Sequence, residues 1–209
     1  MQLAPHSSAR RSAAGRAIAA GAACAVLLLT GCQGSRWETR TGEPDVPQRV
    51  LNLDLGLRNL EEDWAPADSQ FTYGLHYAQT LTEGGHGFEV GFLLGSDSGT
   101  RSGFDIDSDL IEVYGGYHRA FHPISGGLLP YIGAGVGWFD GQITVGSVRD
   151  ESKSAFGLYL QGGLGTWLND RVLLSFGGRF VTGATLDFER GSDLDVTGIM
   201  PYVQLGVGF

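Results

Sequence analysis

Apolar residues recur at every second position from Val50 to the end of the chain. In the first such stretch, the leucines at 51, 53, 55 and 57 alternate with polar residues or glycine. A period of two is typical of a β-strand with one apolar and one polar face, and no window shows the stripe of an amphipathic helix. The sequence therefore predicts an all-β protein with eight strands, around residues 51–57, 71–77, 88–94, 111–117, 130–138, 156–164, 172–180 and 199–209.

The connections between these predicted strands alternate in length. Short ones lie near 82–86, 120–126 and 168–171, and long polar ones lie near 58–69, 96–107, 139–153 and 184–195. Short turns at one end and long loops at the other are typical of barrels in bacterial outer membranes. We therefore expect an eight-stranded antiparallel up-and-down transmembrane β-barrel with short periplasmic turns, long extracellular loops and both termini on the periplasmic side.

The two faces of the strands favour a membrane barrel over a soluble periplasmic one. One face is continuous Leu, Val, Ile, Phe and Tyr, whereas the other carries glycine and charged residues. Charges inside and hydrocarbon side chains in lipid cost less free energy than the reverse arrangement. We expect a polar network inside the barrel, formed by Asp54, His76, Glu89, Glu112, Arg179 and Gln204.

The charged residues of this predicted network need partners of opposite charge. By strand parity, Arg179 and Arg58 face the carboxylates of Asp54, Glu89 and Glu112. Because a buried charge is costly unless it is paired, the pattern favours a packed polar plug over a gated pore. A narrow ion-conducting channel is the alternative.

Glycine is unusually common. It makes up 34 of the 209 residues, more than twice the usual share of about 7%. Most of these glycines lie in mid-strand on the predicted inward face, where an eight-stranded barrel has room only for packed side chains. The net charge is -9. Such an acidic chain lacks the basic surface of a nucleic-acid-binding protein, so we expect no nucleic-acid partner.

The first 31 residues have the features of a signal peptide. Arg10, Arg11 and Arg16 precede an apolar stretch that is too short to span a membrane as a helix. The stretch closes on the sequence LTGC at residues 29–32, which resembles the bacterial lipobox, so we expect Cys32 to be lipidated. We predict a lipoprotein-type signal peptide at 1–31, a flexible tether at 32–49 and the barrel at 50–209.

Two stretches resemble the small outer-membrane β-barrel family, which includes the OmpA transmembrane domain, opacity proteins and porin-family barrels. The sequence PYIGAGVGW at 130–138 is similar to a recurrent strand of that family, and YVQLGVGF at 202–209 is similar to its terminal strand. The resemblance covers roughly residues 50–209. The lipobox departs from the family, whose members usually carry an ordinary signal peptide.

The resemblance implies a location and an assembly route. It implies insertion in the outer membrane by the barrel assembly machinery, which reads alternating apolar residues and a final Phe, here Val203, Leu205, Val207 and Phe209. It also implies outer-membrane lipid and lipopolysaccharide as surroundings. We expect a monomer.

Catalytic and metal chemistry find little support in the sequence. His86 is predicted on the outward face and His118 on the inward face, so they cannot form a metal pair. A lipid A-modifying enzyme would need a nucleophile and a base near the outer leaflet, but His122 and Ser125 lie in a predicted periplasmic turn. We expect no cofactor, no metal and no catalytic residue, with a lipid A deacylase or acyltransferase as the enzymatic alternative.

Acidic residues gather in the long predicted loops. They are Glu61, Glu62, Asp63, Asp97, Asp105, Asp107, Asp109, Asp150, Glu151, Asp187, Glu189, Asp193 and Asp195. An acidic, solvated rim suits contact with other surfaces better than it suits chemistry. The sequence therefore predicts a structural or surface-interaction role, namely membrane integrity, adhesion or ligand contact.

Overall fold

The computed structural model describes residues 49–61, 64–124, 127–189 and 193–209. The predicted signal peptide, Cys32 and all of the predicted tether except Arg49 lie outside these residues. The described residues form the strands β1 (Arg49–Leu60), β2 (Ser69–Thr80), β3 (His86–Arg101), β4 (Phe104–Ala120), β5 (Leu129–Val145), β6 (Val148–Lys153), β7 (Ala155–Trp167), β8 (Val172–Thr182), β9 (Thr185–Phe188), β10 (Asp193–Asp195) and β11 (Gly198–Gly208).

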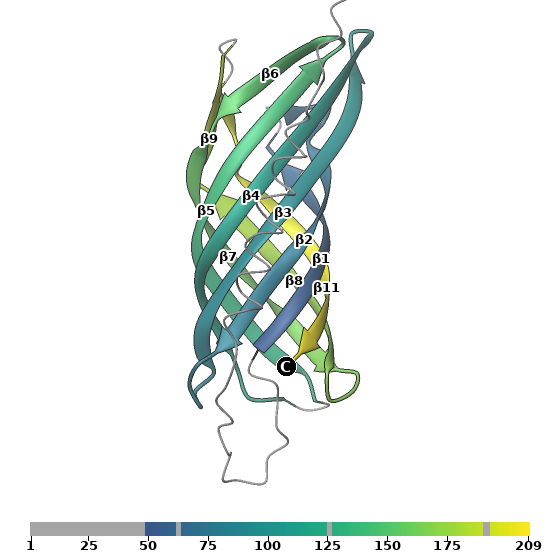
Figure 1. Ribbon diagram of the computed structural model, residues 1–209. Helices are drawn as coiled ribbons and strands as arrows, with labels where there is room; N and C mark the ends of the chain where they lie inside the picture. Colours follow the sequence, from purple (N-terminus) through teal and green to yellow (C-terminus); the bar gives the residue numbers. More distant parts are fainter. Residues whose placement is uncertain (1–48, 62–63, 125–126, 190–192) are drawn as a thin grey trace, which may run out of the picture. The chain divides into compact units, whose positions relative to one another are not determined.

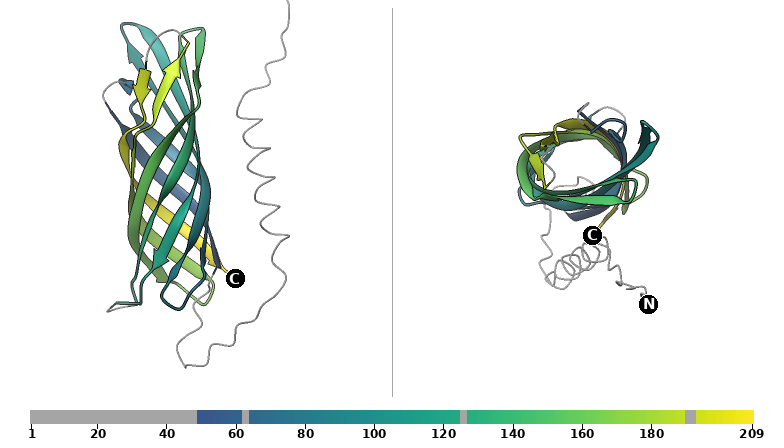
Figure 2. Two further views of the ribbon diagram at one scale, coloured as in Figure 1. Left: turned by 90° about the vertical axis from the view of Figure 1, so that its left-hand side faces the viewer. Right: turned by 90° about the horizontal axis from the view of Figure 1, so that it is seen from above.

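Eight of these strands close into a barrel (Figure 1). Around the wall, the order is β1, β2, β3, β4, β5, β7, β8 and β11, and β11 pairs with β1 to complete the ring. Every neighbouring pair is antiparallel. Figure 2 shows the closed ring from above. The predicted up-and-down transmembrane barrel is confirmed, and closure leaves the wall with no unpaired strand edge.

Two of the predicted long loops are in fact β-hairpins. Residues 96–107 continue β3 and β4, which stay paired up to Arg101 and Phe104. The tight turn between them places Ser102 and Gly103 at φ values of 54° and 82°, as a two-residue hairpin turn requires. Residues 139–153 likewise extend β5 and return as β6. The polar composition of these two stretches led to the prediction of loops. They are paired strands that project beyond the membrane, where both faces of a hairpin can be polar.

The side chains of the barrel strands alternate between a buried inward face and an exposed apolar outward face. On β1, Leu53, Leu55 and Leu57 are exposed, whereas Asp54 and Arg58 are buried. The same sense holds on β7 and β11. This is the polarity of a barrel that stands in lipid. In the part of the chain that the structure describes, no helix is long and apolar enough to span a membrane.

An apolar plug fills the end of the lumen near β6 and β9, at the top of Figure 1. Its members are Leu60, Trp64, Leu93, Leu110, Phe139, Val181, Ala184, Leu186, Phe188, Leu194, Val196 and Met200. Trp64 donates its indole N–H to the Asp195 carbonyl at 2.7 Å, and its ring meets the Phe188 ring edge-on at 6.3 Å. Trp64 thus packs against β9 and the end of β10 at this end of the barrel.

Inward glycines admit the large lumen side chains. A Cβ atom on Gly91 would lie 2.5 Å from the Tyr114 ring, and one on Gly133 would lie 2.2 Å from the Glu89 carboxylate. Both distances are shorter than any real side-chain contact, so a larger residue there would displace its neighbour. The glycine content therefore has a packing cause inside a narrow barrel.

Candidate functional site

The structure places all six predicted lumen residues inside the barrel, one on each of six strands. Asp54 lies on β1, His76 on β2, Glu89 on β3, Glu112 on β4, Arg179 on β8 and Gln204 on β11, and none is more than 3% exposed. A period of two explains this placement, because each lies on the inward parity of its strand.

The upper half of the network is centred on Glu112. Its two carboxylate oxygens accept from Arg58 and from Arg179, and all three side chains are buried. The Arg179 guanidinium also lies 3.9 Å from the centres of the Tyr114 and Tyr159 rings. This geometry combines ion pairing with cation–π contacts on both rings, which fixes the arginine firmly.

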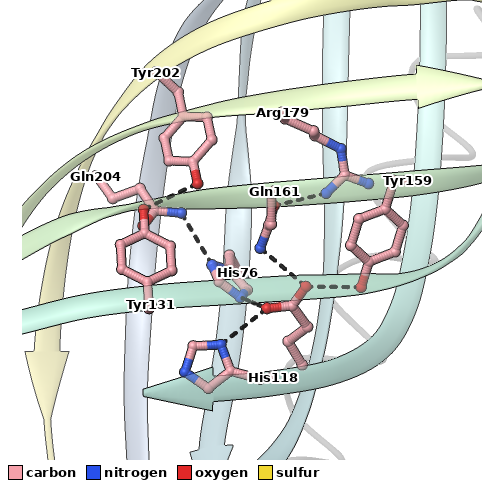
Figure 3. A network of polar contacts seen from close by, with 9 residues as sticks. His76, His118, Tyr131, Tyr159, Gln161, Arg179, Tyr202 and Gln204 are labelled. Atoms are coloured by element: carbon pink, nitrogen blue, oxygen red, sulfur yellow. Dashed lines mark hydrogen bonds and ion pairs between the residues drawn. The ribbon is translucent and has the colours of Figure 1, made fainter. Parts of the chain in front are cut away.

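The lower half is centred on Glu89, and Figure 3 labels its partners His76, His118, Tyr159 and Gln161. One carboxylate oxygen accepts from the Tyr159 hydroxyl at 2.8 Å and from the Gln161 amide at 3.0 Å. The other lies 3.1 Å from His118 Nδ1 and 3.4 Å from His76 Nε2. Four side chains from three strands, β2, β4 and β7, therefore converge on one carboxylate.

Gln161 joins the two halves. Its amide N–H₂ donates to Glu89, and its carbonyl oxygen accepts from Arg179 at 2.8 Å. Gln161 has the inward parity of β7, but nothing in the sequence indicates this bridging position. Arg58 contacts Glu112 as the parity argument expected, whereas Glu89 is surrounded by histidines, tyrosine and glutamine instead of arginine.

Towards the end where the chain terminates, aromatic and amide groups continue the network. The Gln204 amide lies 3.1 Å from His76 Nδ1, and its carbonyl oxygen lies 3.2 Å from the Tyr131 hydroxyl. Tyr131 in turn donates to the Tyr202 hydroxyl at 2.9 Å. Asp54 faces Gln204 across the β1–β11 pair, and its Oδ1 atom has no hydrogen-bond partner among the described residues.

Two lumen carboxylates thus have several partners each: Glu112 pairs with two arginines, and Glu89 accepts hydrogen bonds from Tyr159 and Gln161 beside two histidines. The arrangement offers interlocked ion pairs under an apolar plug. Within residues 49–61, 64–124, 127–189 and 193–209, no group of three or more histidine, cysteine or acidic residues could hold a metal ion. His86 points outward and His118 inward, so these two histidines do not meet.

The predicted assembly residues lie on the lipid-facing side of β11. Val203, Leu205 and Val207 have the outward parity of β11 and are 40–52% exposed, and Phe209, which directly follows the strand, is 54% exposed. Cys32, the predicted lipidation site, lies outside the described residues.

Residues 24–208 match the sequence profile of a family described as outer membrane protein beta-barrel domain. The chain belongs to this family. Its members lie in the outer membrane, and the lipid-facing polarity of the barrel wall agrees with that location. The predicted outer-membrane location is confirmed, and the soluble periplasmic alternative is wrong.

Several solved outer-membrane barrels have the same fold. Neisserial surface protein A is 15% identical, with a TM-score of 0.58 over 78% of this chain and 97% of its own. Ail, the attachment invasion locus protein of Yersinia pestis, is 13% identical, with a TM-score of 0.53 over 78% and 97%. OprG from Pseudomonas aeruginosa is 15% identical, with a TM-score of 0.56 over 78% and 96%. No curated protein matches the chain by sequence.

Proposed function

We propose that this outer-membrane barrel is closed to solutes and acts as a structural or surface-contact protein through its extracellular rim, without catalysis. The observation that carries the proposal is the filled lumen. Paired charges occupy its middle, and the apolar plug covers them at the end where the hairpins project. A barrel filled in this way leaves its projecting hairpins as the parts that can meet a partner.

The acidic residues of the extracellular rim favour a partner with positive charge. Asp105, Asp107 and Asp109 lie on the outward face of the β3–β4 hairpin. Two of the cations at this end are engaged by acids. Lys153 donates to the Asp187 carboxylate at 2.6 Å, which raises the pKa of the Lys153 amine, and Arg149 lies 2.7 Å from Glu151. Acids therefore dominate the accessible charge.

The ligand of one structural neighbour differs in charge from the partner expected for this chain. Ail is named for attachment and invasion, and it has been crystallised with the heparin analogue sucrose octasulfate. A sulfated ligand would meet repulsion at the acidic rim of this chain. We therefore propose adhesion to basic proteins or peptides in place of sulfated glycans.

An adhesion assay tests this role. Bacteria that express the full chain are expected to adhere to a polylysine surface and not to a heparin surface. Replacing Asp105, Asp107 and Asp109 together by Asn should lower adhesion about tenfold, the effect of three exposed ion pairs of about 0.5 kcal/mol each. A control with Glu83→Gln and Asp170→Asn, at the opposite end, should adhere normally. Equal adhesion of all three strains, or adhesion to heparin, would contradict the proposal.

Planar-bilayer recordings test the closed lumen. The full chain is expected to give no stable conductance steps under conditions in which a water-filled porin conducts. Steps from folded protein would favour the alternative of a narrow channel. A change in lipid A mass on expression would instead favour the alternative of a lipid A-modifying enzyme.

The anchor and the assembly signal complete the proposal. We propose that Cys32 is acylated and tethers the chain at the periplasmic side, where a lipobox-type leader would place it. Val203, Leu205, Val207 and Phe209 would present the apolar edge that the barrel assembly machinery recognises. The assembled protein would act as a monomer among lipopolysaccharide and phospholipid.

A further inference from the structure

We propose that the outer wall of the barrel binds the phosphate headgroup of an anionic glycerophospholipid at its short-turn end. The site consists of His86 on β3, Tyr117 and Arg119 on β4, and Phe121 just after β4; we call it the lower arginine site. It lies outside the lumen, and its proposed ligand is independent of the surface role proposed above.

The backbone brings these side chains together on the lipid-facing wall. His86 and Arg119 are direct partners in the β3–β4 ladder. Tyr117 and Arg119 lie on the outward parity of β4, opposite to the buried His118. Phe121 is held by a hydrogen bond from its N–H to the Pro130 carbonyl at 2.9 Å. All four side chains thus border the end of the barrel that carries the short turns.

Arg119 is charged but unpaired in this site. Its guanidinium carbon lies 4.7 Å from the centre of the Phe121 ring. In the described part of the chain, it makes no salt bridge, and its Nε atom is buried without a hydrogen-bond partner. A guanidinium placed on an aromatic ring at a membrane boundary keeps its remaining N–H groups for an anion, and phosphate fits their fork.

The residues around Arg119 indicate that the site lies at the boundary between acyl chains and headgroups. The His86 ring nitrogen Nδ1 lies 2.6 Å from the Tyr117 hydroxyl, and both side chains are exposed. Tyrosine and other polar-ended aromatic residues gather where acyl chains give way to headgroups. The apolar Ile132, the partner of Arg119 on β5, is exposed just beside them. Acyl chains would contact Ile132 while the headgroup meets Arg119.

The positive charge of Arg119 favours an anionic phospholipid headgroup at this site. The opposite end of the wall carries the acidic hairpins, which would repel an anionic headgroup. Short turns lie on the periplasmic side in barrels of this kind, so the leaflet that reaches Arg119 consists of glycerophospholipid. Phosphatidylglycerol, with a net negative charge, gains more from an unpaired arginine than zwitterionic phosphatidylethanolamine does.

Lipid retention tests the site. The full chain is reconstituted in nanodiscs of equal parts phosphatidylethanolamine and phosphatidylglycerol, and co-purifying lipids are counted by native mass spectrometry. Phosphatidylglycerol should be enriched about fivefold among the lipids retained by the wild type, the effect of one interfacial arginine. Arg119→Gln should remove the enrichment, and Arg119→Lys should keep most of it, because the charge remains.

A matched control uses Arg101, an exposed arginine at the tip of the opposite hairpin. Arg101→Gln should retain phosphatidylglycerol like the wild type. Each variant is first shown to be folded by its heat-modifiable migration on gels. The proposal is overturned if the wild type shows no enrichment, if folded Arg119→Gln keeps it, or if added lipopolysaccharide displaces the retained phospholipid.

Discussion

Arg179→Ala is expected to lower the free energy of unfolding by about 3–5 kcal/mol, because it leaves a buried carboxylate short of a partner. Glu112 would keep only Arg58, and the Gln161 carbonyl would lose its donor. The rings of Tyr114 and Tyr159 would also lose the guanidinium between them. The measurement is urea unfolding of the full chain in lipid vesicles, followed by tryptophan fluorescence, with melting in detergent micelles as a second readout.

An exposed arginine provides the control for Arg179. Arg149 lies 2.7 Å from Glu151 on the β6 hairpin, and both side chains are accessible to water. Arg149→Ala should cost about 0–1 kcal/mol, since exposed ion pairs contribute little. If Arg179→Ala proves as mild as Arg149→Ala, the buried network does not stabilise the barrel.

Strand parity explains why so much of the lumen could be predicted. Because side chains alternate across a strand, one correctly assigned lipid-facing leucine, such as Leu53, places its neighbour Asp54 inside. The alternation continued through each strand, so the inward positions of Glu89 and Glu112 followed from local sequence. These positions depend only on the period.

The partners of each charge could not be predicted in the same way. Glu112 meets Arg179 from a strand on the far side of the barrel, at a height that depends on how the whole ring is tilted. Single-strand patterns contain no information about that stagger. Glu89 therefore came to lie among His76, His118 and Tyr159, although the parity argument offered it arginines.

The apolar plug was missed for a different reason. Leu186, Phe188 and Leu194 lie in a segment that its acidic residues marked as a loop. Each of these short strands alternates polar and apolar residues, and the apolar side chains are buried. Trp64 was the one indication of the plug in the neighbouring loop, because a large apolar side chain in a polar segment is usually buried against other apolar residues.

Glu89→Ala is expected to be as damaging as Arg179→Ala, at about 3–5 kcal/mol, because several buried donors would lose one shared acceptor. Gly133→Ala should cost about 1–3 kcal/mol alone, since its new methyl group would overlap the Glu89 carboxylate. Both values are to be measured by the same urea unfolding in vesicles.

The double variant links the two effects. Once Glu89→Ala has removed the carboxylate, the methyl group of Gly133→Ala has no oxygen to displace, so its cost should fall close to zero. The expected coupling is about 1–3 kcal/mol, as is typical of residues in contact. Gly178→Ala is the matched control, because a Cβ atom there would meet nothing within 4 Å; it should leave stability almost unchanged in either background. Strict additivity of Glu89→Ala and Gly133→Ala would mean that the glycine does not make room for the carboxylate, and the packing cause given for the inward glycines would fail at this position.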